Sequence, residues 1–99
     1  LKNFLGYSTG SVASLQSLVG LENFDVSQCT SMYQTFYGCN GLQDISAIEN
    51  WDFSNVTNMN QMLHTSGSTK DASSAQNWNV QGTGKNVFNS NWINIPSWN

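Results

Sequence analysis

Apolar residues along the chain recur at a spacing of 27 positions. When the sequence is shifted by this spacing, the aromatic residues Phe24, Trp51 and Trp78 coincide. The other main coincidences are Leu18, Ile45 and Ala72; Leu21, Ile48 and Ala75; and Val26, Phe53 and Val80. A fixed repeat of this length is typical of chains whose successive units stack and bury a common apolar face. The pattern therefore predicts one domain built from stacked units.

Each unit carries two patterns, which predict a strand and a helix. The segments LQSLVGLEN (15–23) and LQDISAIEN (42–50) fit the leucine-rich-repeat line Leu-x-x-Leu-x-Leu-x-x-Asn. This line predicts a short parallel strand around residues 44–48, with counterparts near 17–21 and 71–75. The next apolar positions have the i, i+3, i+4, i+7 spacing of one helix face; they are Met32, Thr35, Phe36 and Cys39, and then Met59, Met62, Leu63 and Ser66. We therefore expect a strand, a turn, a short helix and a return in each unit.

The repeat makes residues 1–99 a single α/β domain with unequal units. The expected units are a partial one over 1–21, full ones over 22–48 and 49–75, and a degenerate, shortened one over 76–99. A five-residue motif of the form apolar-x-x-(Phe/Trp)-(Asp/Asn), which we call the box, occurs four times. Its last occurrence, IPSWN, ends at the last residue of the sequence. This arrangement predicts that the chain is a piece of a longer array.

Two segments resemble a known family. NWDFSNVTNMNQML (50–63) resembles the Trp-Asp-x-Ser-x-Val-x-x-Met-x-x-Met-Phe signature of BspA-like leucine-rich-repeat surface proteins, and FYGCNGLQDI (36–45) resembles the Phe-x-Gly-Cys-x-x-Leu-x-x-Ile line that follows it. The resemblance covers residues 15–88. It implies a short right-handed leucine-rich-repeat-like solenoid of about 3.5 coils on a secreted or surface-anchored protein. It also implies adhesion or ligand binding rather than catalysis.

The box residues predict two ladders across the units. The aromatic ladder is expected to lie in the core, rather than to form an exposed carbohydrate platform, and consists of Phe24, Trp51 and Trp78. The amide ladder is expected to satisfy backbone groups in the turns of adjacent units, and consists of Asn23, Asn50 and Asn77. Both ladders would be scaffold.

The acidic residues of the box admit two interpretations. Asp25 and Asp52 are expected to bond local backbone amides, as Asp commonly does in turns. The alternative is a calcium site, because Ca²⁺ takes roughly 6–8 oxygen ligands. At the repeat spacing, the further acids that coincide are Asp44 with Asp71 and Glu22 with Glu49.

Composition and charge narrow the classes of partner. Charged residues make up 9% of the chain, far below the roughly 25% of average domains. The net charge is −3, and the only cations are Lys2, Lys70 and Lys85. Since nucleic-acid binding relies on Lys and Arg that neutralise phosphates, this charge excludes a nucleic-acid partner. No apolar run of about 18 residues suits a membrane span. Low charge with abundant Asn, Ser and Thr favours an extracellular or cell-surface location.

Residues with catalytic or metal-binding chemistry are few. His64 is the only histidine, whereas common metal sites take several His or Cys ligands. Nucleophilic catalysis needs a base beside a Ser or Cys, and His64 is expected on the exposed side of a helix. We therefore expect no enzyme, no metal and no cofactor. Cys29 and Cys39 fall in apolar columns and are expected to be buried free thiols, while a disulfide stays open because a secreted chain permits one.

These observations favour a non-enzymatic recognition or adhesion module. Tyr33 and Tyr37 lie at i and i+4 of the first expected helix, and their counterparts in the next unit are Asn60 and His64. We predict that these four residues form a contact strip for a protein or glycan ligand, or for neighbouring copies of the chain. The alternative function is a structural subunit of a filament, surface layer or virion, assembled by end-to-end stacking of solenoids.

Overall fold

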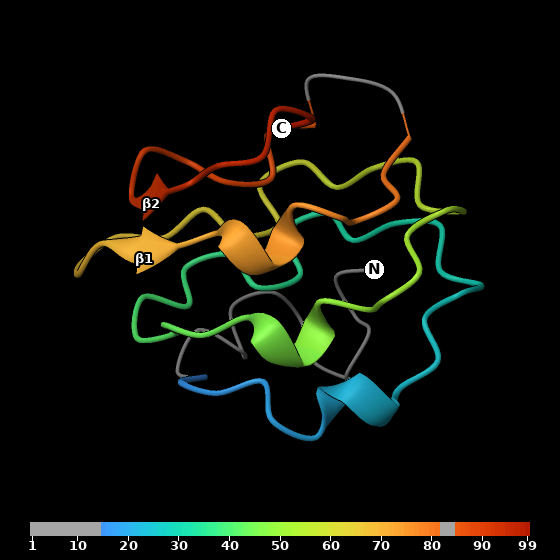
Figure 1. Cartoon of the computed structure of the whole chain (residues 1–99), viewed down its shortest axis with the longest axis horizontal. Helices are drawn as coiled ribbons and strands as arrows, with labels where there is room; N and C mark the ends of the chain where they lie inside the picture. The colour runs from blue at the N-terminus through green and yellow to red at the C-terminus, as the bar shows by residue number, and fades with distance from the viewer. Residues whose placement is uncertain (1–14, 82–84) are drawn as a thin grey trace.

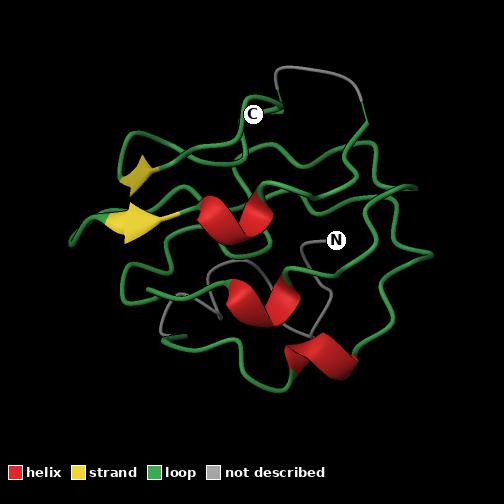
Figure 2. Cartoon of the chain, in the orientation of Figure 1, coloured by secondary structure: helices red, strands yellow, loops and turns green. Residues whose placement is uncertain are grey.

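The computed structural model describes residues 15–81 and 85–99, and most of these residues lie in turns and loops. In chain order the elements are 3-10 helices of a single turn and two strands: η2 (Leu21–Asn23), η3 (Ser46–Ile48), β1 (Lys70–Asp71), η4 (Ser73–Ala75) and β2 (Trp92–Ile93). Figure 1 shows η2, η3 and η4 one above another, and η2 contacts η3. The backbone between these elements is loop and turn (Figure 2).

The sheet formed by the described residues is small. β1 and β2 pair in parallel, with Lys70 opposite Trp92 and Asp71 opposite Ile93. Isolated parallel bridges join two further pairs, Ser31 with Asn58 and Leu63 with Phe88. The partners in each pair come from successive units of the sequence. Successive segments of the chain therefore run side by side in the same direction.

The predicted strands are wrong except at Asp71, the last residue of β1. η3 lies within the segment 44–48 and η4 within 71–75, where extended chain was expected. The reason is local turn chemistry, because the Ser46 amide donates to the Asp44 carboxylate (2.8 Å). Asp and Ser favour such turns, and Asp is a poor strand former.

The predicted short helices are also wrong, because the described residues contain no α-helix. Every second amide from residue 32 to 38 donates to a carbonyl of the next unit, at 2.8–3.1 Å; the pairs are Met32–Asn58, Gln34–Asn60, Phe36–Met62 and Gly38–His64. The intervening amides at Thr35 and Tyr37 donate to carbonyls three residues back. Gln34 and Gln61 adopt positive φ angles of 54° and 59°, which interrupt a helix. The i, i+3, i+4 spacing thus marks tight turns, and isolated helices shorter than about 12 residues have little stability of their own.

The prediction of a right-handed α/β solenoid of about 3.5 coils is therefore wrong. The described strands are two residues long, and no regular succession of strand and helix is present in residues 15–81 and 85–99. The radius of gyration is 12.0 Å. A compact domain of this size has a radius of gyration of about 13 Å. The molecule is a small globule in which neighbouring turns are bonded to each other.

Aromatic rings connect the core of the globule. The ring centroids of Trp51 and Phe53 are 6.2 Å apart, and those of Phe53 and Trp78 are 4.5 Å apart. Trp51 and Trp78 are 5% and 4% exposed, whereas Phe24, in the same sequence column, is 47% exposed. Phe53 therefore joins the two buried tryptophans, and Phe24 lies at the surface. Around the rings pack apolar side chains that recur in the sequence, among them Met32, Phe36, Ile45, Met59 and Met62.

Polar side chains at equivalent positions of successive units also bond to each other. Gln34 Nε2 donates to Gln61 Oε1 (2.7 Å), and Asn79 Nδ2 donates to Asp52 Oδ1 (2.8 Å). Such bonds fix the register of one segment against the next. Within the described residues no side-chain hydrogen bond comes from the three exposed amides of the expected ladder, Asn23, Asn50 and Asn77.

Candidate functional site

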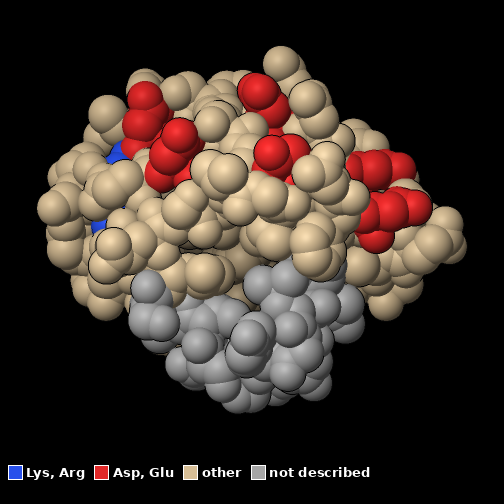
Figure 3. Space-filling view, turned by 90° about the horizontal axis from the view of Figure 1, so that it is seen from below, with Lys and Arg blue, Asp and Glu red and all other residues tan. Residues whose placement is uncertain are grey.

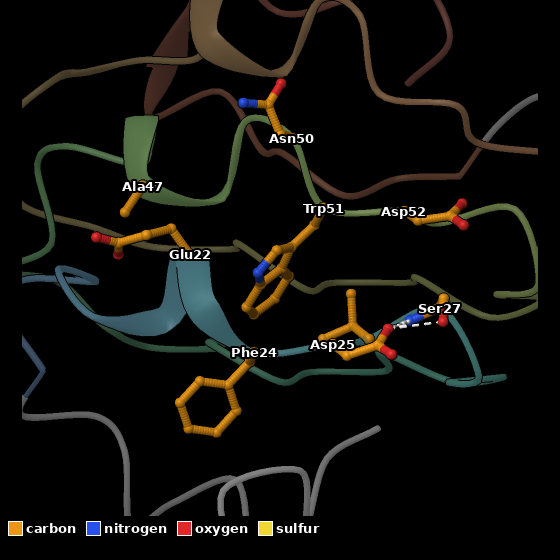
Figure 4. A pocket seen from close by; sticks show the side chains of 9 residues that line it. Glu22, Phe24, Asp25, Ser27, Ala47, Asn50, Trp51 and Asp52 are labelled. Atoms are coloured by element: carbon orange, nitrogen blue, oxygen red, sulfur yellow. Dashed lines mark hydrogen bonds between the residues drawn. The ribbon is translucent and has the colours of Figure 1, made fainter.

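A hollow of about 220 Å³ opens between the first two boxes of the sequence. We call it the acidic hollow, and its lining residues are Glu22, Phe24, Asp25, Val26, Ser27, Ala47, Asn50, Trp51 and Asp52. Figure 4 shows the Trp51 indole extending from the segment after η3 toward the segment after η2, with Glu22 on one side and Asp25 and Asp52 on the other. Two segments that coincide at the repeat spacing thus build one cavity.

The buried indole of Trp51 holds these two segments together. Its Nε1 donates to the carbonyl of Leu21, the first residue of η2 (2.9 Å). Because η2 ends at Asn23, the chain leaves it at Phe24 in extended backbone, and the ring of Phe24 stays 47% exposed beside the hollow. The aromatic position of the box is therefore a core residue at Trp51 and an accessible ring at Phe24.

Hydrogen bonds keep the two aspartates of the hollow ionised. Asp25 accepts from the Ser27 hydroxyl (2.6 Å) and amide (3.0 Å), and these bonds lower the pKa of the Asp25 carboxyl below its ordinary 3.8. Asp52 accepts from Asn79 Nδ2 (2.8 Å) and the Ser54 amide (2.9 Å), which lower its pKa in the same way. The prediction that both residues bond local backbone amides is confirmed.

The carboxylates of the hollow accept most of their hydrogen bonds through one oxygen each. The Ser27 bonds to Asp25 and the bonds from Asn79 and the Ser54 amide to Asp52 go to Oδ1, and Glu22 accepts the Gly20 amide through Oε1 (2.6 Å). The Ser54 side chain also bonds the Asp52 carboxylate. The Ser27 bonds lower the pKa of Asp25 more than the negative charge of Asp52 raises it.

The described surface around the hollow is acidic. All six Asp and Glu residues of the sequence are exposed, and Figure 3 shows acidic side chains across one face with only traces of lysine. Lys70 is only 2% exposed, and its Nζ donates to neutral oxygens of Ser66, Ser68 and Asn91 at 2.8–3.0 Å. Lys70 therefore forms no ion pair with the described acidic residues of this face.

The predicted contact strip is divided in the structure. Tyr37 and His64 line a second hollow of about 280 Å³, which we call the polar hollow; its other lining residues are Gly38, Asn40, Thr65, Ser66 and Asn89. Tyr33 and Asn60 are half-buried and do not line it. The four residues lie on the turns described above rather than on a helix face, and their role in binding stays a prediction.

The two cysteines lie outside both hollows. Cys29 and Cys39 are free thiols, the first half-buried and the second buried, and burial raises the pKa of Cys39 to about 11. Within residues 15–81 and 85–99, no group of three or more His, Cys, Asp or Glu side chains is arranged to hold a metal ion.

No helix of these residues has the length and apolarity to cross a membrane.

Sequence reasoning assigned the boxes to scaffold and missed both hollows. The signal for the acidic hollow was present, because the repeat places Asp25 beside Asp52 and Phe24 beside Trp51. The repeat does not show that the ring of Phe24 is exposed. The polar hollow is built by Asn and Ser residues in turns, which no spacing distinguishes from other loop residues.

Comparison with known proteins gives one family. No curated protein and no solved structure gave a significant match to the chain. Residues 7–99 match the profile of a family described as "Mycoplasma protein of unknown function, DUF285", and since the match covers nearly the whole sequence, the chain belongs to that family.

Proposed function

We propose that this protein is a non-enzymatic recognition or adhesion module at the cell surface, and that the acidic hollow binds a Lys or Arg side chain of a partner protein. The observation that carries the proposal is the set of three exposed carboxylates, Glu22, Asp25 and Asp52, that line one hollow beside an aromatic ring. The resemblance of residues 50–63 to the BspA-like signature supports surface display.

The chemistry of the hollow suits a cation on an apolar stem. Ammonium and guanidinium groups are donors only, and they match carboxylate oxygens that act as acceptors only. The exposed ring of Phe24 offers an aromatic face, which attracts a cation near its centre and packs against a methylene chain. The exposed acidic surface would also raise the association rate of a basic partner.

The protonation states support binding rather than acid catalysis. Glycoside hydrolysis by a carboxylate pair requires one carboxyl group that is protonated near neutral pH, and therefore a raised pKa. The pKa values of Asp25 and Asp52 are both lowered, chiefly by side-chain hydrogen bonds from Ser27 and Asn79 respectively. Neither carboxyl group can donate a proton at neutral pH.

An acetylated tetra-lysine peptide tests this proposal by calorimetric titration at low ionic strength. We expect the double substitution Asp25→Asn and Asp52→Asn to weaken binding roughly tenfold, because two exposed charge interactions are lost. Asn keeps an oxygen for the Ser27 and Ser54 amides, so the turns are retained. Added salt should weaken binding to the unmodified protein, since it screens exposed charges.

The matched control is the double substitution Asp44→Asn and Asp71→Asn. It removes the same charge from the same kind of turn, in which Asp44 bonds the Ser46 amide and Asp71 the Ser73 amide, outside the hollow. We expect this variant to bind the peptide like the unmodified protein. Equal weakening in both variants, or no binding by the unmodified protein, would contradict the proposal.

A further inference from the structure

The polar hollow is held open by bonds between equivalent turns of two successive units. Gly38 N donates to the His64 carbonyl (2.9 Å), and Ser66 N donates to Asn40 Oδ1 (2.9 Å). These bonds fix the backbone on both sides of the cavity, so its walls are in place before a ligand arrives. The lining contains no Asp, Glu, Lys or Arg, in contrast to the acidic hollow.

Several polar groups of this lining have no partner within the described residues. Asn40 uses Oδ1 for the Ser66 amide, and its Nδ2 donor is uncommitted. His64 Nε2 lies 3.0 Å from the Asn86 carbonyl, which only accepts, so Nε2 carries the hydrogen and Nδ1 of the neutral ring is an acceptor. The hydroxyls of Tyr37 and Ser66 add groups that both donate and accept. The hollow thus combines a donor, an acceptor and two hydroxyls without a charge.

An exposed aromatic ring stands beside these groups. The Tyr37 side chain is 42% exposed where it lines the hollow. A flat aromatic face packs against the apolar C–H face of a sugar ring, while amide and imidazole groups bond the hydroxyls at the ring edge. The volume of about 280 Å³ lies near the lower end of the range of about 300–1,000 Å³ for small-molecule sites. It suits one ring rather than an extended ligand.

We propose that the polar hollow is a carbohydrate subsite, which binds one neutral sugar residue of a glycan. Tyr37 supplies the stacking face, Asn40 Nδ2 donates to a hydroxyl, and His64 Nδ1 accepts from a neighbouring hydroxyl. The site is separate from the acidic hollow, since no residue lines both. A module with both hollows would bind two ligands of different chemistry.

Ligand-observed saturation-transfer NMR tests this inference with the methyl β-glycosides of glucose, galactose and N-acetylglucosamine. We expect at least one glycoside to receive saturation from the protein. In ¹⁵N–¹H correlation spectra of the labelled protein, the same glycoside should shift the backbone amides of Gly38 and Ser66. Tyr37→Ser should abolish this signal. Asn40→Asp should weaken binding about tenfold, because the acceptor for the Ser66 amide is kept while the free donor is lost.

Phe24→Ser is the matched control, because it removes the exposed ring of the acidic hollow and leaves the polar hollow intact. We expect it to bind the glycoside normally and Tyr37→Ser to bind tetra-lysine normally, with both variants retaining the thermal transition of the unmodified protein. The inference is overturned if no glycoside binds, if Phe24→Ser loses the glycoside as Tyr37→Ser does, or if Asn40→Asp binds it fully. Loss of the glycoside alone leaves the proposed peptide binding intact.

Discussion

Replacing Trp51 with Ala should lower the free energy of unfolding by about 3–5 kcal/mol, as large-to-small changes of buried aromatic residues do. Trp51 is 5% exposed, its ring lies 6.2 Å from that of Phe53, and its Nε1 bonds the Leu21 carbonyl. The substitution removes the ring from the core and takes away one of the two donors to that carbonyl, which keeps the Phe24 amide (3.0 Å). Denaturant unfolding followed by far-ultraviolet circular dichroism measures the change.

Phe24→Ala is the control for this substitution, because Phe24 occupies the same column of the sequence one unit earlier. Its side chain is 47% exposed, so truncation should cost less than about 1 kcal/mol. If the two substitutions destabilised the protein equally, the assignment of Trp51 to the core and of Phe24 to the surface would be wrong.

Replacing Lys70 with Met should lower the free energy of unfolding by roughly 2–3 kcal/mol, because its acceptors lose a charged donor. Lys70 is 2% exposed, and its Nζ donates to the carbonyls of Ser66 and Ser68 and to Asn91 Oδ1. Burial lowers the pKa of the ammonium below its ordinary 10.5, so the hydrogen bonds are needed to offset its desolvation. Met keeps the length of the side chain without the donor.

Lys85→Met provides the charge-matched control, since both substitutions change the net charge from −3 to −4. Lys85 is half-buried, and its Nζ donates to no residue in the described parts of the chain. We expect this change to stay within about 0.5 kcal/mol. Equal losses would mean that net charge, rather than the oxygen cage around Lys70, determines the result.

Periodicity in the sequence predicted most of the core residues and which segments lie together, but it wrongly placed Phe24 in the core. Trp51, Phe53 and Met62 are buried where the repeat places them. The repeat also brings residues such as Gln34 and Gln61 into hydrogen-bond contact. This part succeeds because burial of apolar surface depends on the positions of apolar residues and less on the local backbone.

The backbone conformation was not predictable from the same pattern. Apolar residues at i, i+3 and i+4 occur on a helix face, but they also occur where tight turns alternate with bonds to the next segment, as at Met32 and Phe36. Positive φ at Gln34 has no signal in a residue type that seldom adopts it. Burial of Lys70 was equally hidden, because one of its acceptors is the distant Asn91.

The two hollows depend on differences between equivalent positions of the units, and a repeat pattern does not show these differences. Phe24 and Trp51 coincide in the sequence, yet only Phe24 is accessible at the acidic hollow. The contact strip was expected on a helix face, and only Tyr37 and His64 of its four residues line a common hollow. Tyr37 and His64 line the hollow because of the turns in which they lie, and side-chain spacing in the sequence does not predict this.

Mapping the bound tetra-lysine peptide on the ¹⁵N-labelled protein by NMR tests most directly the claim that the acidic hollow is a recognition site. The account predicts shifts of the Trp51 indole N–H and of the Ser27 and Ser54 amides, which bond Asp25 and Asp52. The Ser46 and Ser73 amides bond Asp44 and Asp71 in equivalent turns outside the hollow, and they should not shift. Equal shifts at all four serines, or none at Trp51, would contradict the account.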